Sequence, residues 1–284
     1  MAFKDILLAL TSYPAPTPDT SIDCAVALAA GLGAQVTALA FESEAKLMHS
    51  PNMFTNMLVD VPQLLLEERA KSIAHAKHLL EYFRASATRQ RLTHEALLRK
   101  GIAFQIPDAF TEHAKLHDLT IVPLQEGNSV EQWYAEAIIF GSGRPVILMP
   151  GGKRPGAAPF FQRVTVAWDS SRPAARALAD ALPVLEKAKH IQVVTITNEK
   201  KISGTHSPAD LASHLLKHGL EAKFDFVDAK GRSAGAALAD YLDSTGSDFL
   251  VMGAYGHSRI KEFILGGATR NMLDSPPVPV LLSH

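Results

Sequence analysis

Residues 249–269 read FLVMGAYGHSRIKEFILGGAT. The apolar start of this stretch, from Phe249 to Met252, is typical of a buried strand. Two residues separate Gly253 from Gly256, and nine separate Gly256 from Gly266. Glycines between a strand and a helix let main-chain N–H groups approach an anion, and the dipole of the helix favours negative charge there. The stretch therefore predicts a strand, a phosphate-binding loop and a helix, a unit that is typical of an α/β fold.

The bulk composition is that of a globular chain. It has 284 residues, 47% hydrophobic and 20% charged, a length that fits two domains. The formal net charge of −1 gives no field that would recruit nucleic acid or an anionic membrane. Cys24 is the only cysteine, which excludes an intrachain disulfide and a cysteine-cluster metal site. Without a long apolar run or a signal-peptide pattern, we expect a cytoplasmic protein that binds neither nucleic acid nor membrane.

The two halves of the chain can be aligned with each other. Three residue pairs anchor the alignment: Thr11 with Asp169, Gln35 with Gln192, and Gly101 with Gly231. The offsets are 158, 157 and 130 residues, so the first half has 27 extra residues between its second and third strands. These residues predict a long helix from about Pro62 to Ala87. A stripe at helical spacing predicts its core-facing side; the members are Leu66, Ala70, Ile73, Ala74, Lys77 and Leu80.

Strand and helix patterns alternate in both halves. Each half is predicted to run β-α-β-α-β-α-β-α-β, with helices near residues 22–32 and 173–187, among others. The strands are continuous apolar runs, as expected when both faces are covered. This pattern predicts two Rossmann-like α/β domains, each a five-stranded parallel-type sheet with helices on both faces. The stretch PGGKRPG at 150–156 is a linker, which bounds the domains at 1–150 and 157–284.

On these residues the chain resembles the universal stress protein family in its tandem two-domain form. The family's nucleotide signature is G-x2-G-x9-G followed by Ser or Thr. Gly253, Gly256 and Gly266 match it, whereas Gly267 occupies the hydroxyl position. The resemblance covers essentially the whole chain and is stronger in 162–284 than in 1–150. It implies an adenine nucleotide alpha hydrolase-like fold and a role in the stress response.

The resemblance also implies an arrangement of the two halves. They would form an internal pseudo-dimer in which the last strands, around Val146 and Val280, pair near a two-fold axis. A further homodimer is open, and the sequence does not identify a protein partner.

The same resemblance implies an ATP site in the second half. An aspartate after the first strand would lie near the adenosine, apolar residues would line the adenine, and glycines would face the phosphates. The matching residues are Asp169, Ile196, Met252, Gly253, Gly256, Gly266, Gly267, Ala268 and Thr269. Because Gly267 lacks the hydroxyl, ATP, ADP and AMP all stay open as ligands, with or without Mg²⁺. Ser258 or Thr269 could replace the hydroxyl, and His257 is a further candidate for phosphate contact.

The first half has lost this signature. Thr11 replaces the aspartate, Pro123 stands opposite Gly253, and Glu126 stands where the second glycine would be. Proline has no N–H to donate, and a glutamate would repel a phosphate. We therefore expect no ATP at this position and a structural role for residues 1–150, in place of a second subunit.

Other kinds of site are less well supported. His113 with His117, and His214 with His218, have i,i+4 spacing, but neither pair has a cysteine or carboxylate that completes a metal motif. We interpret all four as solvated helix residues and assign no metal site.

No catalytic residue is assigned either. The chain has no nucleophile elbow and no P-loop, and Ser170 and Ser171 are expected to cap a helix that starts near Pro173. The sequence favours a nucleotide-dependent regulatory or binding module. Two alternatives stay open: a slow ATP-hydrolysing enzyme in which Arg259 and Lys261 steady phosphate charge, and a structural partner protein without a ligand.

Overall fold

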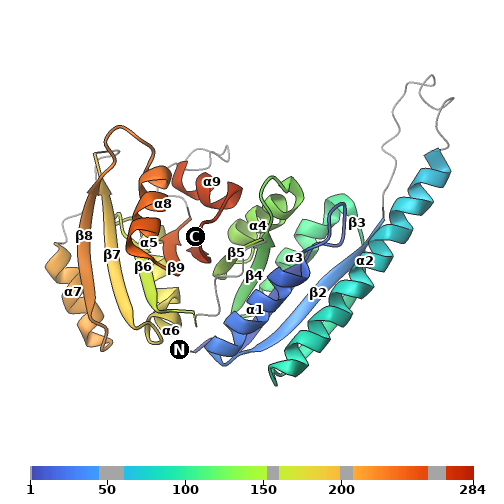
Figure 1. The fold of residues 1–284 in the computed structure, drawn as a ribbon, viewed down its shortest axis with the longest axis horizontal. Coiled ribbons are helices and arrows are strands. Elements are labelled where there is room, and N and C mark those ends of the chain that lie inside the picture. The colour runs from blue at the N-terminus through green and yellow to red at the C-terminus, as the bar shows by residue number, and fades with distance from the viewer. Residues whose placement is uncertain (1, 45–60, 152–159, 199–206, 255–266) are drawn as a thin grey trace.

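The structure is a computed structural model that describes residues 2–44, 61–151, 160–198, 207–254 and 267–284. Strands and helices alternate along both halves, as the sequence predicts (Figure 1). The first half contains β1 (Asp5–Leu10), α1 (Asp19–Leu32), β2 (Gln35–Glu44), α2 (Val61–Arg89), β3 (His94–Ile102), η2 (Ala103–Gln105), α3 (Ile106–Ala114), β4 (Leu119–Leu124), α4 (Ser129–Gly141) and β5 (Val146–Pro150). The second contains β6 (Arg163–Ala167), α5 (Arg172–Asp180), α6 (Leu182–Leu185), β7 (His190–Thr197), α7 (Pro208–Lys217), β8 (Ala222–Asp228), α8 (Ala234–Thr245), β9 (Phe249–Gly253), α9 (Gly267–Asp274) and β10 (Val280–Ser283).

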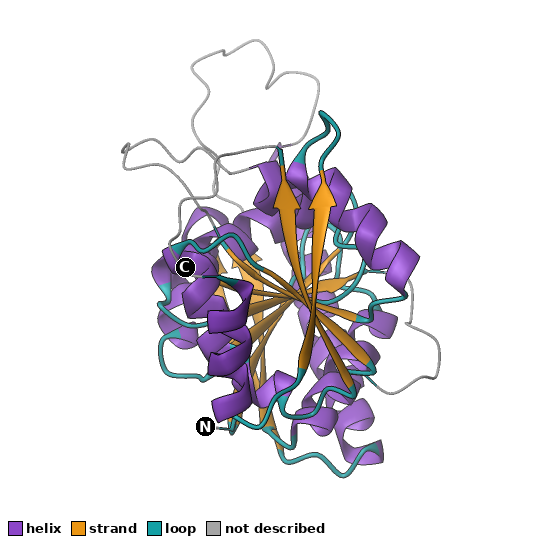
Figure 2. Ribbon diagram, turned by 90° about the vertical axis from the view of Figure 1, so that its left-hand side faces the viewer, coloured by secondary structure: helices purple, strands orange, loops and turns teal. Residues whose placement is uncertain are grey.

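The strands form one ten-stranded, strongly twisted sheet (Figure 2). Their order is β3-β2-β1-β4-β5-β10-β9-β6-β7-β8, and neighbours within each half are parallel. At the centre β5 and β10 are antiparallel, with Val280 opposite Leu148 and Leu282 opposite Val146. The predicted pairing of the two last strands is confirmed. We call this β5–β10 pair the seam.

Helices cover both faces of the sheet and create two hydrophobic clusters. Helices α1, α2, α5, α6 and α7 contribute to one cluster, and α3, α4, α8 and α9 contribute to the other. Because successive strand residues point to opposite faces, Ile6 and Leu8 belong to the first cluster and Leu7 to the second. Each cluster contains residues of both halves, so hydrophobic burial continues across the seam.

A repeated hydrogen-bond pattern supports part of the internal alignment. Asp118 accepts from the main-chain N–H groups of residues 4 and 5, at 2.8 and 3.2 Å. Asp248, 130 residues later, accepts from those of residues 162 and 163, at 2.7 and 3.1 Å. The two aspartates thus tie the starts of β1 and β6 to the turns that precede β4 and β9.

The sheet register corrects the predicted alignment of the second strands. Asp5 pairs with Gln35, and its counterpart Arg163 pairs with His190, so Gln35 corresponds to His190 and not to Gln192. A shift of two residues keeps every side chain on the same face of a strand, so the apolar pattern could not detect it.

The predicted helix 62–87 is confirmed as α2, but of its predicted core-facing stripe only Leu80 is buried. Leu66 is 62% exposed, whereas Ala76, Leu79 and Phe83 are buried. The N-terminal turns of α2 extend beyond the end of β2 (Figure 1). The buried face also includes small and polar residues such as Ser72, which a search for apolar residues passes over.

The single helix predicted for 173–187 is also wrong. Two shorter helices, α5 and α6, occupy this region. Pro183 lies in the first turn of α6, because a proline has no N–H to continue the preceding helix.

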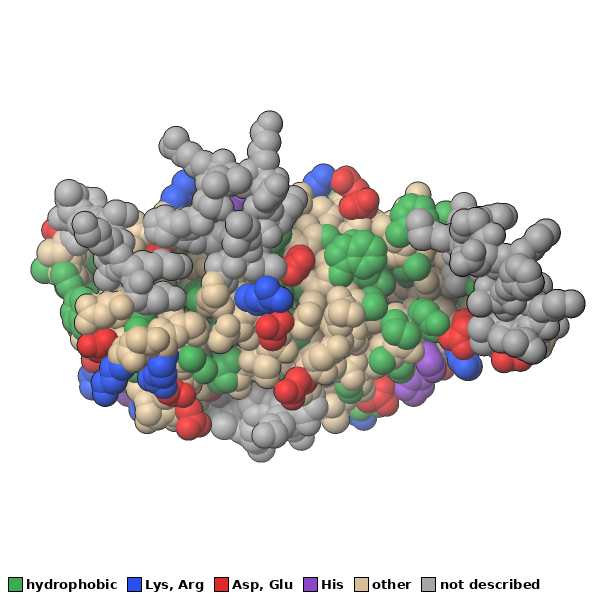
Figure 3. Space-filling view, turned by 90° about the horizontal axis from the view of Figure 1, so that it is seen from above, with side chains coloured by type: hydrophobic (Ala, Val, Ile, Leu, Met, Phe, Trp, Pro, Cys, Tyr) green, Lys and Arg blue, Asp and Glu red, His purple; other side chains and the backbone are tan. Residues whose placement is uncertain are grey.

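Charged and apolar side chains are mixed on the surface. In the face shown in Figure 3, basic and acidic side chains alternate over the described part of the chain. None of the helices in the described ranges has the length and apolar character needed to cross a bilayer.

The seam can be tested by a cavity mutation. Leu281 lies opposite Ile147 and is 0% exposed, so Leu281→Ala should lower the free energy of unfolding by about 2–5 kcal/mol. Leu216→Ala is the control, because Leu216 is 58% exposed and its loss should change stability by less than about 0.5 kcal/mol. Urea denaturation measures both variants, and equal midpoints would contradict the assigned packing.

Candidate functional site

Four of the predicted site residues lie at the carboxyl ends of β6, β7 and β9, and three lie in the first turn of α9; the four are Asp169, Ile196, Met252 and Gly253, and the three are Gly267, Ala268 and Thr269. The strand order β9-β6-β7 makes β6 a topological switch point, because the chain leaves it towards β7 and returns on its other side through β9. In open α/β sheets ligands bind in the crevice outside the carboxyl ends of the strands at such a point. Asp169 follows β6, and Gly253 ends β9. The two residues therefore flank the switch point.

The loop after β6 holds Asp169 in a defined position. Its Oδ1 accepts a hydrogen bond from the main-chain N–H of Ser171 at 2.9 Å, and the side chain is exposed. The hydroxyl of Ser171 accepts from the N–H of Ala174 at 3.2 Å, which confirms Ser171 as the N-cap of α5. Ser170 does not cap the helix but has a φ of +61°. The carboxylate of Asp169 thus projects beside the start of α5.

Three apolar residues of the predicted site pack against one hydrophobic cluster. Met252 is 5% exposed and belongs to the cluster that α8 and α9 cover. Ile196 and Ala268 are partly buried against the same cluster.

Gly253 and Gly267 have different structural surroundings. A Cβ atom on Gly253 would lie 2.5 Å from the main-chain N of Ala174 and 2.5 Å from the C of Pro173. Glycine is therefore required there so that the start of α5 can approach the end of β9. Nothing lies within 4 Å of a Cβ placed on Gly267, the first residue of α9. Of these two glycines, Gly267 is the one with open space beside its main chain, among the residues that the structure describes.

Most of the rest of the glycine motif lies outside the described residues. Gly256 and Gly266 lie outside the described residues, as do His257, Ser258, Arg259 and Lys261. Thr269 is 2% exposed, so its side chain is packed inside the protein.

Sequence reasoning missed a polar group at the ends of β7 and β8. The carboxylate of Asp228 accepts from the main-chain N–H of Lys230 at 2.8 Å and from the side-chain amide of Asn198 at 3.0 Å. These two hydrogen bonds, with that of Lys230 the stronger, hold the pKa of Asp228 below its usual value. The signal in the sequence was a polar residue directly after each apolar strand.

Unusual backbone conformations gather at the same edge. Ser170, Asn198 and Lys230 follow β6, β7 and β8, and they have φ values of +61°, +61° and +51°. Left-handed conformations are unfavourable for residues other than glycine and cluster at functional sites.

Comparisons with known proteins identify a related family and a shared fold. The sequence profile of the universal stress protein family matches residues 160–284. Residues 160–284 form a universal stress protein domain. A universal stress protein of Synechocystis sp. is 40% identical over 48 residues, which is 17% of this chain and 17% of that relative's length.

Solved structures share the fold of the whole chain. A universal stress protein from Archaeoglobus fulgidus superposes with a TM-score of 0.64 at 16% identity, covering 98% of this chain and 97% of the other. A functionally unknown protein from Pseudomonas aeruginosa superposes with a TM-score of 0.55 at 13% identity, covering 99% and 92%. Residues 1–150 therefore have the same Rossmann-like fold as the universal stress protein domain.

The carboxyl edge of the first half differs from that of the universal stress protein domain because α2 covers it. Thr11, the counterpart of Asp169, is 3% exposed. The next residue, Ser12, donates from its hydroxyl to the carbonyl of Phe41 at 2.5 Å, and its hydroxyl lies 3.3 Å from that of Ser72 on α2. His75, one turn further along α2, contacts the carbonyl of Ser12 at 3.0 Å. The space beside β1 and β2 is filled by the protein itself.

A buried carboxylate lies at the same edge of the first half, beside the loop that follows β4. Glu131, on the first turn of α4, is 0% exposed and accepts from the main-chain N–H of Gln125 at 2.6 Å. The side-chain amide of Gln125 donates to Glu131 at 3.1 Å and to the carbonyl of Pro16 at 3.3 Å. Gln125 thereby ties the loop after β4 to the loop after β1. Glu126, which we expect to repel a phosphate, is exposed, and Glu131 is a second carboxylate that is buried at this edge.

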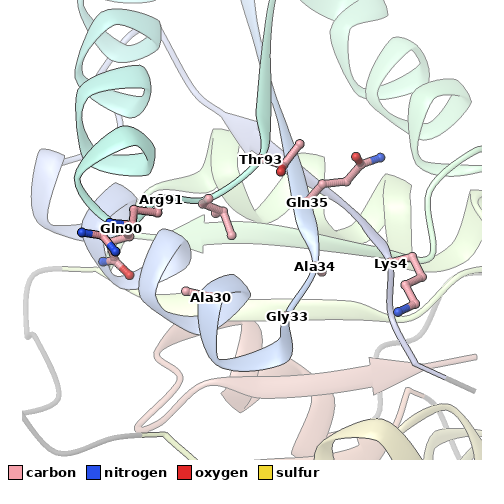
Figure 4. A pocket seen from close by; sticks show the side chains of 9 residues that line it. Lys4, Ala30, Gly33, Ala34, Gln35, Gln90, Arg91 and Thr93 are labelled. Carbon is pink, nitrogen blue, oxygen red and sulfur yellow. The ribbon is translucent and has the colours of Figure 1, made fainter.

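One described cavity lies at the opposite edge of the sheet. It has a volume of about 550 Å³ and lies at the amino ends of β1, β2 and β3 (Figure 4). Its lining includes Lys4, Gln35 and Thr93, all exposed. The cavity is therefore separate from the carboxyl edge.

The histidine pairs do not form a metal site. Within the described ranges, no group of three or more His, Cys, Asp or Glu side chains is arranged to hold a metal ion. His214 and His218 are exposed, as predicted. The prediction for His117 is wrong, because His117 is 9% exposed and its Nδ1 lies 2.8 Å from the carbonyl of His113. His117 follows α3, and its Nε2 lies 3.9 Å from Oδ2 of Asp5, the first residue of β1.

The two glycines make a matched test of packing. Gly253→Ala should lower the free energy of unfolding by about 2 kcal/mol, because the added Cβ meets the backbone of α5. Gly267→Ala has open space and should leave stability unchanged or raise it by up to about 1 kcal/mol. Thermal denaturation compares them, and a Gly253→Ala variant as stable as Gly267→Ala would contradict the close approach of α5 to β9.

Glu131 should make stability depend on pH. Burial raises the pKa of Glu131 from 4.5 to about 7, and the hydrogen bonds from Gln125 offset this only in part. The folded state then holds a proton that the unfolded chain releases, so the free energy of unfolding falls as pH rises from about 4.5 to about 7, by up to about 3 kcal/mol. Glu131→Gln should flatten this slope in urea denaturation, and the exposed control Glu126→Gln should not. Equal slopes for the two variants would contradict the assignment.

Proposed function

We propose that the universal stress protein domain binds an adenine nucleotide, ATP, ADP or AMP, at the carboxyl ends of β6, β7 and β9. The protein then acts as a nucleotide-dependent regulatory or binding module in a cytoplasmic stress response. One observation carries the proposal: Asp169 and Gly253 flank the topological switch point, and the side chain of Asp169 is exposed there.

The chemistry of the described residues fits the parts of such a ligand. The carboxylate of Asp169 can accept hydrogen bonds from ribose hydroxyls, and Ile196 and Met252 offer an apolar surface to adenine. Gly267 and Ala268 begin α9, where main-chain N–H groups and the helix dipole favour phosphate oxygens. A Mg²⁺ ion would enter with the phosphates, because it is usually held by few protein groups when a nucleotide supplies oxygens.

The first half supports this function without a nucleotide of its own at the equivalent edge. The side chains of Ser72, His75, Gln125 and Glu131 occupy that edge. Residues 1–150 instead provide the other half of a continuous sheet, in the position of a second subunit.

The proposal predicts a selective loss of binding. Asp169→Ala should weaken ATP binding at least about tenfold, since it removes hydrogen bonds to a ligand. Asp243→Ala, an exposed aspartate on α8, is the control and should bind as the wild type does. Isothermal titration calorimetry measures both. Equal affinity of the two variants, or no binding of ATP, ADP or AMP by the wild type, would overturn the proposal.

A further inference from the structure

Helix α4 of the first half lies beside the glycine motif of the second half. The ring of Phe140 on α4 packs edge-on against the ring of His284, with centroids 5.1 Å apart and an interplanar angle of 78°. The Nδ1 of His284 lies 3.1 Å from the carbonyl oxygen of Ala254, the residue that follows Gly253. A chain of two contacts thus joins the first half to the start of the glycine motif.

The main chain of Ala254 is held at both of its polar groups. Its N–H donates to the carbonyl of Ser283 at 2.8 Å, and its carbonyl accepts from His284. Ala254 is also 0% exposed. These contacts extend the parallel pairing of β9 and β10 by one residue, so the direction in which the chain leaves β9 is set by residues 283 and 284.

Helix α9, on the other side of the glycine motif, is also close to α4. Glu136 on α4 is partly buried, and burial raises its pKa. The positive charge of Arg270 on α9 lowers that pKa, and the negative charge of Asp274 raises it. Charges on α9 therefore act directly on a carboxyl group of α4.

We propose that α4 positions Ala254 and α9, which it contacts, so that the first half sets the nucleotide affinity of the second. Phe140 and His284 are the positioning residues. The inference rests on the proposed function, and it gives residues 1–150 a regulatory role in addition to a structural one. A change in the first half that shifts α4 would change nucleotide binding more than 100 residues away in the sequence.

Calorimetric titration with ATP tests the proposal on the full-length protein. Phe140→Ala and His284→Ala should each weaken binding about fivefold, the change that corresponds to about 1 kcal/mol. His284→Asn should weaken binding less than His284→Ala does, because an asparagine amide can still donate to the Ala254 carbonyl although it cannot replace the ring contact with Phe140. The control is Trp133→Ala, an exposed aromatic residue on the same helix that is 45% exposed, and its affinity should not change.

Amide hydrogen exchange without nucleotide gives a second readout. Exchange of the Ala254 N–H should be faster in Phe140→Ala and His284→Ala than in the wild type and in Trp133→Ala, because the contact that holds residue 254 is weakened. If Asp169→Ala loses ATP while Phe140→Ala and His284→Ala bind as the wild type does, the inference is wrong and the proposed function stands. If the wild type binds no adenine nucleotide, the proposed function is wrong and the inference falls with it.

Discussion

The antiparallel pairing of β5 with β10 is the interaction on which the rest of this structure depends. Each half has its own parallel five-stranded arrangement, and either one alone would expose the edge of its last strand. Joining the two edges gives every strand at the centre a partner and makes both hydrophobic clusters continuous, with Ile147 and Leu281 fully buried at the joint. The same pairing brings α4 next to α9 and Phe140 next to His284. The seam therefore stabilises the sheet and also places α4 of the first half beside the candidate site of the second half.

The two halves use the same fold in different ways. At the carboxyl edge of the first half, Ser72 and His75 fill the space beside β1, and Gln125 with Glu131 fills the space beside β4. At the equivalent edge of the second half Asp169 is exposed, and three residues other than glycine have left-handed backbones. Burial and hydrogen bonds stabilise the first edge. The second keeps an exposed carboxylate and strained backbone, features that proteins retain where they bind ligands.

The sequence predicted those features that local chemistry determines. The alternation of strands and helices and the cap at Ser171 are confirmed. The seam around Val146 and Val280, which the family resemblance implied, is also confirmed. The buried face of α2 and the burial of His117 depend on tertiary contacts, so periodicity could not predict them. Nor could it predict Glu131 as the carboxylate that fills the first half's edge, because Glu126 has the same chemistry in the same loop region. In the candidate site, Asp169, Ile196 and Met252 lie at one edge of the sheet as the resemblance implied. The sequence did not predict the hydrogen bond between Asn198 and Asp228, because these residues lie at the ends of two different strands.

We propose that one half of the protein binds an adenine nucleotide and that the other half is closed to it. Native mass spectrometry of the intact chain with excess ATP measures this stoichiometry directly, because each bound nucleotide adds its own mass. We expect one nucleotide per chain, and none after Asp169→Ala. Two nucleotides per chain would show that the first half is open, and none in the wild type would show that the second half is not a nucleotide site.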